Sequence, residues 1–482
     1  MAGEAALDSY ANDQALDNFR RADRATGASR DARKAQALSG IARSQSSSII
    51  SVDQYQLAWN TLIEAFDLYV DLGKTDTAAE LATESFAFGP LTGTEPLLRR
   101  ALELVEPGSN LEGWLRARYG IAQMDDTSDF DAAELAHRRA IDVADATGDD
   151  RLKARATVHL SQLAHARADY DSCVATGREA VRLTRESDDS SGEARVGYFL
   201  ADALLAVGLP DEARDVSLST LDVSERIATG NWVTGAVRSL NQAAIAQGQF
   251  ELDFHGISSD IGELTSRIVK DLRVGVDILT APSRAVDTIN DALDKAVAAG
   301  GPGAYGFLNS TAKAGYLSYM TDDSSLAHRM IETRAHLLLH LHPHERNAFA
   351  LNIGLAWAAV TISDHQTAGE MLDRLTPYSG RVEPQTTCSV DRVLGSIACL
   401  LGAETNAAAH YLSALEFLTN AGYRPELAWT SSDYAEMLLD RDESGDREKA
   451  IELQDEALAI TQELGMQPLT ERILARREIL RA

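Results

Sequence analysis

The sequence contains few of the residues that disulfide-stabilised and sheet-rich proteins depend on. Its 482 residues include three cysteines, eleven prolines and only 6% aromatic residues. The cysteines, Cys173, Cys388 and Cys399, form no CxxC pair and no even-numbered framework, which argues against a disulfide scaffold. We therefore expect buried free thiols and a reducing, cytoplasmic location. The scarcity of prolines and aromatics favours long helices over a sheet-rich core.

Positive charge and long apolar runs are also scarce. The 45 basic residues face 73 acidic ones, which leaves a formal net charge of −28. Such a surface repels nucleic acid and anionic membranes, so we expect no direct contact with either. The longest apolar stretch, Leu351 to Ile362, is interrupted by polar and glycine residues and is too short to cross a bilayer. No basic region followed by an apolar core opens the chain, so we expect no secretory signal.

What the sequence does contain is an internal repeat with a period of forty residues. The repeat is clearest between Leu115 and Phe250, where positions forty apart keep residues of one kind. Small residues at helical spacing let a neighbouring helix approach closely, and a period of this length is typical of helical solenoids. The matched sets are Leu160, Leu200 and Leu240; Ala164, Leu204 and Ala244; Ala168, Gly208 and Gly248; Ala133, Cys173 and Ala213; and Ala140, Ala180 and Thr220.

The pattern of a small, a larger and a second small residue recurs along most of the chain. We therefore predict an all-α protein, a right-handed superhelical solenoid of about a dozen helix pairs with a period of about forty residues. An N-terminal array would cover residues 1–252 and a C-terminal array residues 307–482. An irregular helical segment and a glycine-rich joint would lie between them, at residues 253–306. Further occurrences of the pattern begin at Ala15, Ala58, Thr94, Ala285, Ala327, Ala368, Ala407 and Ala450.

These repeats resemble tetratricopeptide repeats of the longer, forty-residue kind. The tail, with Gly422 to Thr430, Gly445 to Ala450 and Glu463 to Met466, is similar to the C-terminal end of large bacterial signalling proteins. In those proteins an ATPase module precedes a tetratricopeptide superhelix that is coupled to an adenylate or guanylate cyclase domain or a LuxR-type DNA-binding domain. The resemblance covers the repeats alone. It implies an ATPase module upstream or in trans, and it supplies no catalytic residue.

The resemblance also implies which residues line a binding groove, because the first helix of each tetratricopeptide pair faces the concave surface. The forty-residue phase then places arginines, amides and an aromatic side chain on that face. Since the planar guanidinium fork suits carboxylates and phosphates, we predict an acidic protein or peptide partner. Alternatively, these arginines pair with neighbouring acids of the chain itself. The predicted groove residues are Arg118, Arg155, Gln162, Arg195, Tyr198, Arg238 and Gln242, with Asp125, His165 and Asp202 on the same face.

Other candidate sites have simpler interpretations. His336 and His340 lie four apart and would share a helix face, a spacing that can ligate zinc or nickel, but no named metal motif matches and a polar helix end is the alternative. Gly73-Lys74-Thr75 resembles the end of a phosphate-binding loop, yet Leu68 stands where that loop needs glycine, so we expect a helix end there. No GxSxG motif or cysteine nucleophile context occurs. We predict no catalytic residue and no cofactor.

The sequence thus predicts a non-catalytic protein-interaction or regulatory scaffold that uses the concave face of its superhelix. The alternative is a ligand-sensing regulatory region of a bacterial ATPase-coupled signalling protein, either a cyclase or a transcriptional regulator. The same phase places Tyr316, Tyr319 and Trp357 inward, where we expect core packing rather than an apolar binding surface.

Overall fold

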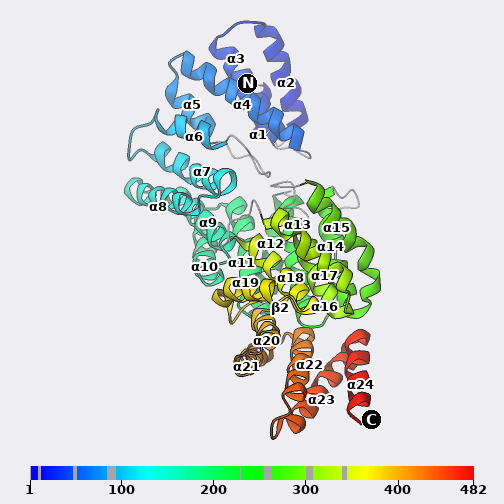
Figure 1. The fold of residues 1–482 in the computed structure, drawn as a ribbon. Coiled ribbons are helices and arrows are strands. Elements are labelled where there is room, and N and C mark those ends of the chain that lie inside the picture. Colours follow the sequence, from blue (N-terminus) through cyan, green and yellow to red (C-terminus); the bar gives the residue numbers. More distant parts are fainter. Residues whose placement is uncertain are drawn as a thin grey trace. The chain divides into compact units, whose positions relative to one another are not determined.

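The computed structural model describes residues 2–8, 12–46, 52–83, 94–227, 230–254, 263–299, 308–338 and 345–481. Within these ranges the chain is all-α, with successive helices joined by short turns and one hairpin of two-residue strands (Figure 1). Helices adjacent in the sequence pack on one another, as a solenoid requires. The chain divides into two compact units: unit 1 comprises Met1–Leu163 and Glu179–Gly192, and unit 2 comprises Ala164–Arg178 and Glu193–Ala482.

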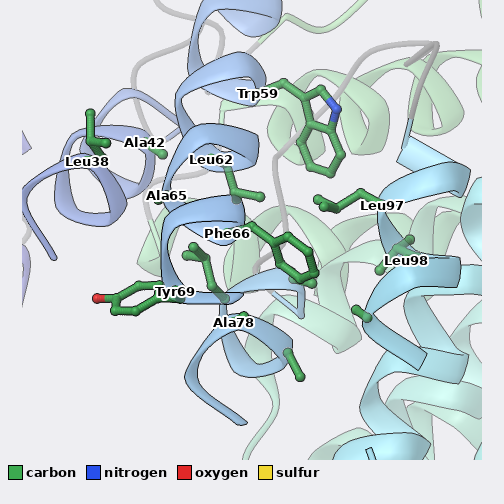
Figure 2. Packing of buried hydrophobic residues seen from close by; sticks show 14 of the residues in the cluster. Leu38, Ala42, Trp59, Leu62, Ala65, Phe66, Tyr69, Ala78, Leu97 and Leu98 are labelled. Carbon is green, nitrogen blue, oxygen red and sulfur yellow. The ribbon is translucent and has the colours of Figure 1, made fainter. Parts of the chain in front are cut away.

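Unit 1 is built around a cluster of large apolar side chains. Trp59, Leu62 and Phe66 lie on one helix and face Leu97 and Leu98 of another (Figure 2). Helical spacing places the three α4 side chains on one stripe, which is the face that must leave water. The helices are α1 (Ala2–Asp8), α2 (Asn12–Thr26), α3 (Ala32–Ser46), α4 (Val52–Asp71), α5 (Thr75–Ala82), α6 (Thr94–Leu102), α7 (Asn110–Thr127), α8 (Phe130–Thr147) and the first part of α9 (Asp150–Ala166).

Unit 2 contains the longer run of helices and the hairpin. Its elements are α10 (Tyr170–Glu186) and α11 (Ser190–Ala206), each shared in part with unit 1, then α12 (Pro210–Arg226), α13 (Gly230–Ala246), α14 (Glu263–Thr280), η1 (Pro282–Arg284), α15 (Val286–Ala299), α16 (Leu308–Thr321), α17 (Ser324–Leu338), α18 (Arg346–Ile362), α19 (His365–Leu375), η3 (Thr376–Tyr378), β1 (Val382–Glu383), β2 (Cys388–Ser389), α20 (Val390–Leu400), α21 (Glu404–Ala421), α22 (Arg424–Arg441), α23 (Asp446–Leu464) and α24 (Gln467–Arg481).

Unit 2 also brings together segments that lie far apart in the sequence. The hydroxyl of Tyr423, just before α22, donates a hydrogen bond to the carbonyl of Leu205 on α11 at 2.7 Å. The ring of Phe417 lies against Gly208, and Leu464 lies against Gly248. The last helix pairs of unit 2 therefore cover the ends of its first ones, so the unit is not an open array of neighbours alone.

The predicted repeat is confirmed, and its residues have two structural roles: some pack between helices and others end a helix. The first small residue of each occurrence of the recurring pattern is buried between helices. Ala168, Gly208 and Gly248 instead end the first helix of each pair with left-handed backbones, at φ 55°, 82° and 87°. In each case the next residue's N–H closes the helix on the carbonyl of the matching set Ala164, Leu204 and Ala244. The fully buried small positions include Ala15, Ala58, Ala133, Cys173, Ala213, Ala327, Ala368, Ala407 and Ala450.

Several sequence expectations concern the remaining segments. The helix end expected at Gly73 is confirmed, because this residue has φ +69° two positions after the last residue of α4, and the N–H of Lys74 donates to the carbonyl of Tyr69 in that helix. The boundaries predicted at residues 252 and 306 stay predictions, and the glycine-rich joint from Gly300 lies outside the described residues. Among the described helices, none has the length and hydrophobicity that crossing a bilayer requires.

The backbones of α16 and α18 come into contact through a pair of glycines. A Cβ atom at Gly315 would lie 1.7 Å from the carbonyl oxygen of Gly354, and one at Gly354 would lie 2.5 Å from the carbonyl oxygen of Ala312. We expect Gly315→Ala to lower the free energy of unfolding by about 1–3 kcal/mol, the usual cost of overpacking. Urea denaturation followed by circular dichroism measures this loss.

A helical glycine with open surroundings provides the matched control. Gly369 on α19 has no atom within 4 Å of an added Cβ, so Gly369→Ala should stabilise the protein by about 0.5–1 kcal/mol through helix propensity alone. Equal stabilities for the two variants would show that α16 and α18 do not approach this closely.

Candidate functional site

In unit 1, the predicted groove residue with the best-defined contacts is Arg155 on α9. Its Nε and Nη2 donate to the two carboxylate oxygens of Asp189 at 3.0 and 2.7 Å, and the arginine side chain is only 16% exposed. Asp189 also accepts from the backbone N–H of Gly192 and so caps the start of α11. Arg155 therefore holds a buried helix cap in place. Arg118 on α7 and Gln162 on α9 are both partly buried.

In unit 2, the predicted groove residues form a chain of polar contacts between helices. Arg238 on α13 donates to Asp202 on α11 at 2.8 Å, and the second oxygen of this carboxylate lies 2.8 Å from His165 Nε2. The Arg238 guanidinium lies over the Tyr198 ring at 4.8 Å, and that of Arg195 over Trp232 at 5.5 Å. The pairing alternative therefore holds for Arg155 and Arg238. Whether these residues bind a partner stays a prediction.

Burial and charge act in opposite directions on this cluster. Burial alone would raise the pKa of Asp202, but the nearby Arg238 and His165 together hold it below its ordinary range. Burial lowers the pKa of His165, and the carboxylate of Asp202 opposes that shift only in part. His165 is therefore neutral at pH 7 and donates its Nε2 proton to Asp202, so Arg238 is the cation that balances this carboxylate.

Gln242, the last predicted groove residue, contacts a segment far away in the sequence. Its side-chain amide donates to the backbone carbonyl of Gln385 at 3.0 Å. Both residues line a small cavity with Thr386, Tyr316 and the buried Lys313, whose ammonium donates to Asp271 at 2.8 Å. The cavity has room for about one water molecule.

Gln385 belongs to the hairpin β1–β2, which the sequence analysis did not anticipate. Val382 pairs with Ser389 and Glu383 with Cys388, and these four residues are buried. One carboxylate oxygen of Glu383 accepts from the Gln385 and Thr386 N–H groups, and so fixes the turn. The available sequence signal was the loss of helical periodicity after Leu375, where the break from Pro377 to Gly380 is followed by another proline, Pro384.

The second site missed from the sequence surrounds Arg392 on α20, whose side chain is 0% exposed. Its guanidinium donates to Asp433 at 2.6 Å and to Glu426 at 2.9 Å, both on α22. The rings of Tyr316, Tyr319, Trp357 and Trp429 surround the cation, with centroids 4.6–5.7 Å from its central carbon; we call these seven residues the Arg392 cage. The core role predicted for Tyr316, Tyr319 and Trp357 is confirmed.

The candidate metal ligands lie beyond what the structure describes. His340 is outside the described residues, as is the side chain of His336, although its backbone belongs to α17. Among the residues that are described, no group of three histidine, cysteine, aspartate or glutamate side chains is arranged to hold a metal ion. The metal candidate is therefore untested.

Comparison with known proteins adds little to this description. No family model matches the chain, and no curated protein matches it. One solved structure to which it is similar is described as a "Circular tandem repeat protein with novel repeat topology and enhanced subunit contact surfaces". The identity is 13%, with 97% of this chain and 89% of that chain covered, at a TM-score of 0.15. So low a score supports no structural conclusion. The class rests on the helices themselves, which define an all-α helical-repeat protein.

Proposed function

We propose that the chain is a non-catalytic protein-interaction or regulatory scaffold whose first helices bind an acidic segment of a partner protein. The observation that carries this proposal is the chemistry of those helices, since Arg155 on α9 and Arg238 on α13 each hold a carboxylate. Carboxylate binding by guanidinium groups is directional and charge-assisted. Both arginines are paired with carboxylates of the chain itself, so a partner carboxylate would have to compete with Asp189 or Asp202 for these guanidinium groups.

We also propose that the helix pairs are of the tetratricopeptide type and act in the cytoplasm with an ATPase module, in the same longer chain or in trans. The forty-residue spacing of the turn residues Ala168, Gly208 and Gly248 supports the repeat type, and the tail from Gly422 to Met466 supports the signalling context.

Arg195 provides the cleanest test of this proposal. Removing Arg155 would leave the buried Asp189 without its counterion, so a loss of binding there would be confounded by a loss of stability. Arg195→Gln removes a guanidinium that lies over the ring of Trp232. We expect this change to weaken binding of a fluorescein-labelled peptide of alternating glutamate and serine about tenfold, the effect of one charge-assisted hydrogen bond. Fluorescence anisotropy measures the affinity.

The control variant is Arg138→Gln on α8, whose exposed guanidinium pairs with Glu134. It should bind the peptide as the wild type does. Rising salt should weaken wild-type binding, because charges are screened over about 8 Å at physiological ionic strength. Equal affinities for both variants, or failure of the peptide to bind at all, would contradict the proposal.

A further inference from the structure

The hairpin β1–β2 is buried although it is short and polar, which is unusual for a segment in a protein interior. Val382, Glu383 and Cys388 are fully buried, and the segment contains a carboxylate and two threonines. Burying a carboxylate is unfavourable unless it is compensated, so the surroundings of this hairpin must supply charge and hydrogen-bond donors. Those surroundings include Gln242, one of the predicted groove residues of unit 2.

Contacts fix the hairpin at its tip and at both ends. At the tip, the side-chain amide of Gln242 on α13 donates to the backbone carbonyl of Gln385, in the turn of the hairpin, at 3.0 Å. Just before β1, Arg381 forms an ion pair with Asp171 of α10. At the end of β2, Glu426 of α22 accepts from the Ser389 N–H at 2.8 Å. Side chains from three helices thus hold the segment in its hairpin conformation.

The charge of the hairpin also fits the predicted partner. Burial is the main influence on Glu383 and raises its pKa, while Arg346 acts in the opposite direction. Arg238 interacts electrostatically with the same carboxylate, although less strongly than with Asp202. Only one Glu383 oxygen has a hydrogen-bond partner among the described residues. Because only one oxygen of the Glu383 carboxylate accepts hydrogen bonds, part of the cost of desolvating this group is uncompensated. A peptide whose carboxylate is fully hydrogen-bonded can therefore displace the hairpin.

We propose that the hairpin from Val382 to Ser389 is an intramolecular ligand of α13, the helix that carries Arg238 and Gln242, and that an acidic partner peptide binds by displacing it. This inference rests on the proposed function and deepens it, because it specifies how this helix is kept occupied. The competing partner is an extended peptide that presents a carboxylate toward Arg238 and a backbone carbonyl to Gln242. Release of the hairpin exposes Cys388, whose thiol is otherwise buried beside Trp357.

Cys388 reports hairpin release directly once the other two thiols are removed. Cys173→Ala is a conservative change, because alanine occupies the equivalent repeat positions 133 and 213. Together with Cys399→Ala it leaves Cys388 as the only thiol of the full chain. Iodoacetamide labelling, followed by mass spectrometry, then measures how often the hairpin opens. The alternating glutamate–serine peptide should increase the labelling rate about tenfold, and a glutamine–serine peptide of equal length should leave it unchanged.

A second experiment changes Glu383, the carboxylate of the hairpin itself. Glu383→Gln removes the charge and keeps the shape, so we expect faster Cys388 labelling and tighter binding of the acidic peptide than in the parent protein. The matched control is Glu456→Gln on the exposed surface of α23, which should change neither. The peptide arm needs no change in the hairpin, so it remains informative if the Glu383 variant folds poorly.

The outcomes separate this inference from the proposed function. If the acidic peptide binds and Cys388 reactivity does not change, the hairpin is not displaced and this inference is wrong, while the scaffold proposal stands. If no acidic peptide binds the parent or the Glu383→Gln protein, both are wrong. Faster labelling with the acidic peptide alone supports both.

Discussion

Replacing Arg392 with methionine is expected to lower the free energy of unfolding of unit 2 by about 3–5 kcal/mol, the cost of removing one partner from a buried ion pair. The substitution leaves the carboxylates of Glu426 and Asp433 buried without the cation that lies between them. The aromatic rings that face the guanidinium lose their cation–π contacts as well. Trp357 and Trp429 lie in this cage, so their fluorescence in a urea titration reports the loss.

Two further variants distinguish an electrostatic effect from a packing effect. Adding Glu426→Gln and Asp433→Asn to Arg392→Met removes the uncompensated charges and should recover most of the stability. Arg424→Met breaks the exposed ion pair with Glu463 and should cost less than about 1 kcal/mol. If the triple variant is no more stable than Arg392→Met, the Arg392 side chain stabilises unit 2 through packing and not through its charge.

Unit 1 should lose stability as pH falls below 6.5, because it buries a neutral histidine. His137 on α8 is 0% exposed, and neither ring nitrogen has a hydrogen-bond partner among the described residues. Burial lowers its pKa from 6.5 to about 3. His137 is therefore protonated near pH 6.5 in the unfolded chain, but in the folded chain it becomes protonated only near pH 3. This difference costs about 1.4 kcal/mol per pH unit within that window, or about 2 kcal/mol between pH 6.5 and 5.

The variant His137→Leu tests this effect, because leucine cannot be protonated and is similar in size. At pH 7 it should be at least as stable as the wild type, since an unsatisfied buried polar group is removed. At pH 5 its advantage should grow by about 2 kcal/mol. His328→Leu, at an exposed position on α17, should leave the pH dependence unchanged. Parallel pH profiles for wild type and His137→Leu, from urea titrations followed by circular dichroism, would refute the assignment.

The structure also explains why part of the candidate site was visible in the sequence. Arg155 and Arg195 lie forty residues apart on successive first helices, and the interval of four residues between Arg238 and Gln242 places that pair on one face of α13. What each side chain touches does not follow from that spacing. Asp189 was visible only as one acid among many, yet it is the buried partner of Arg155. The opposite charge nearest in the sequence is often not the one nearest in space.

The sequence by itself determined the helical class, the forty-residue period and the buried small residues, including Ala133 and Ala213. These features depend on side chains within one or two turns of each other, or on one repeat packing against the next, so local spacing encodes them. Only the tertiary structure decided that Gln242 binds Gln385 and that Arg392 is surrounded by Tyr316, Trp357 and Glu426. Such contacts join residues 34–143 positions apart. Their formation depends on how unit 2 brings separate helix pairs together, which a periodic pattern along the chain does not specify.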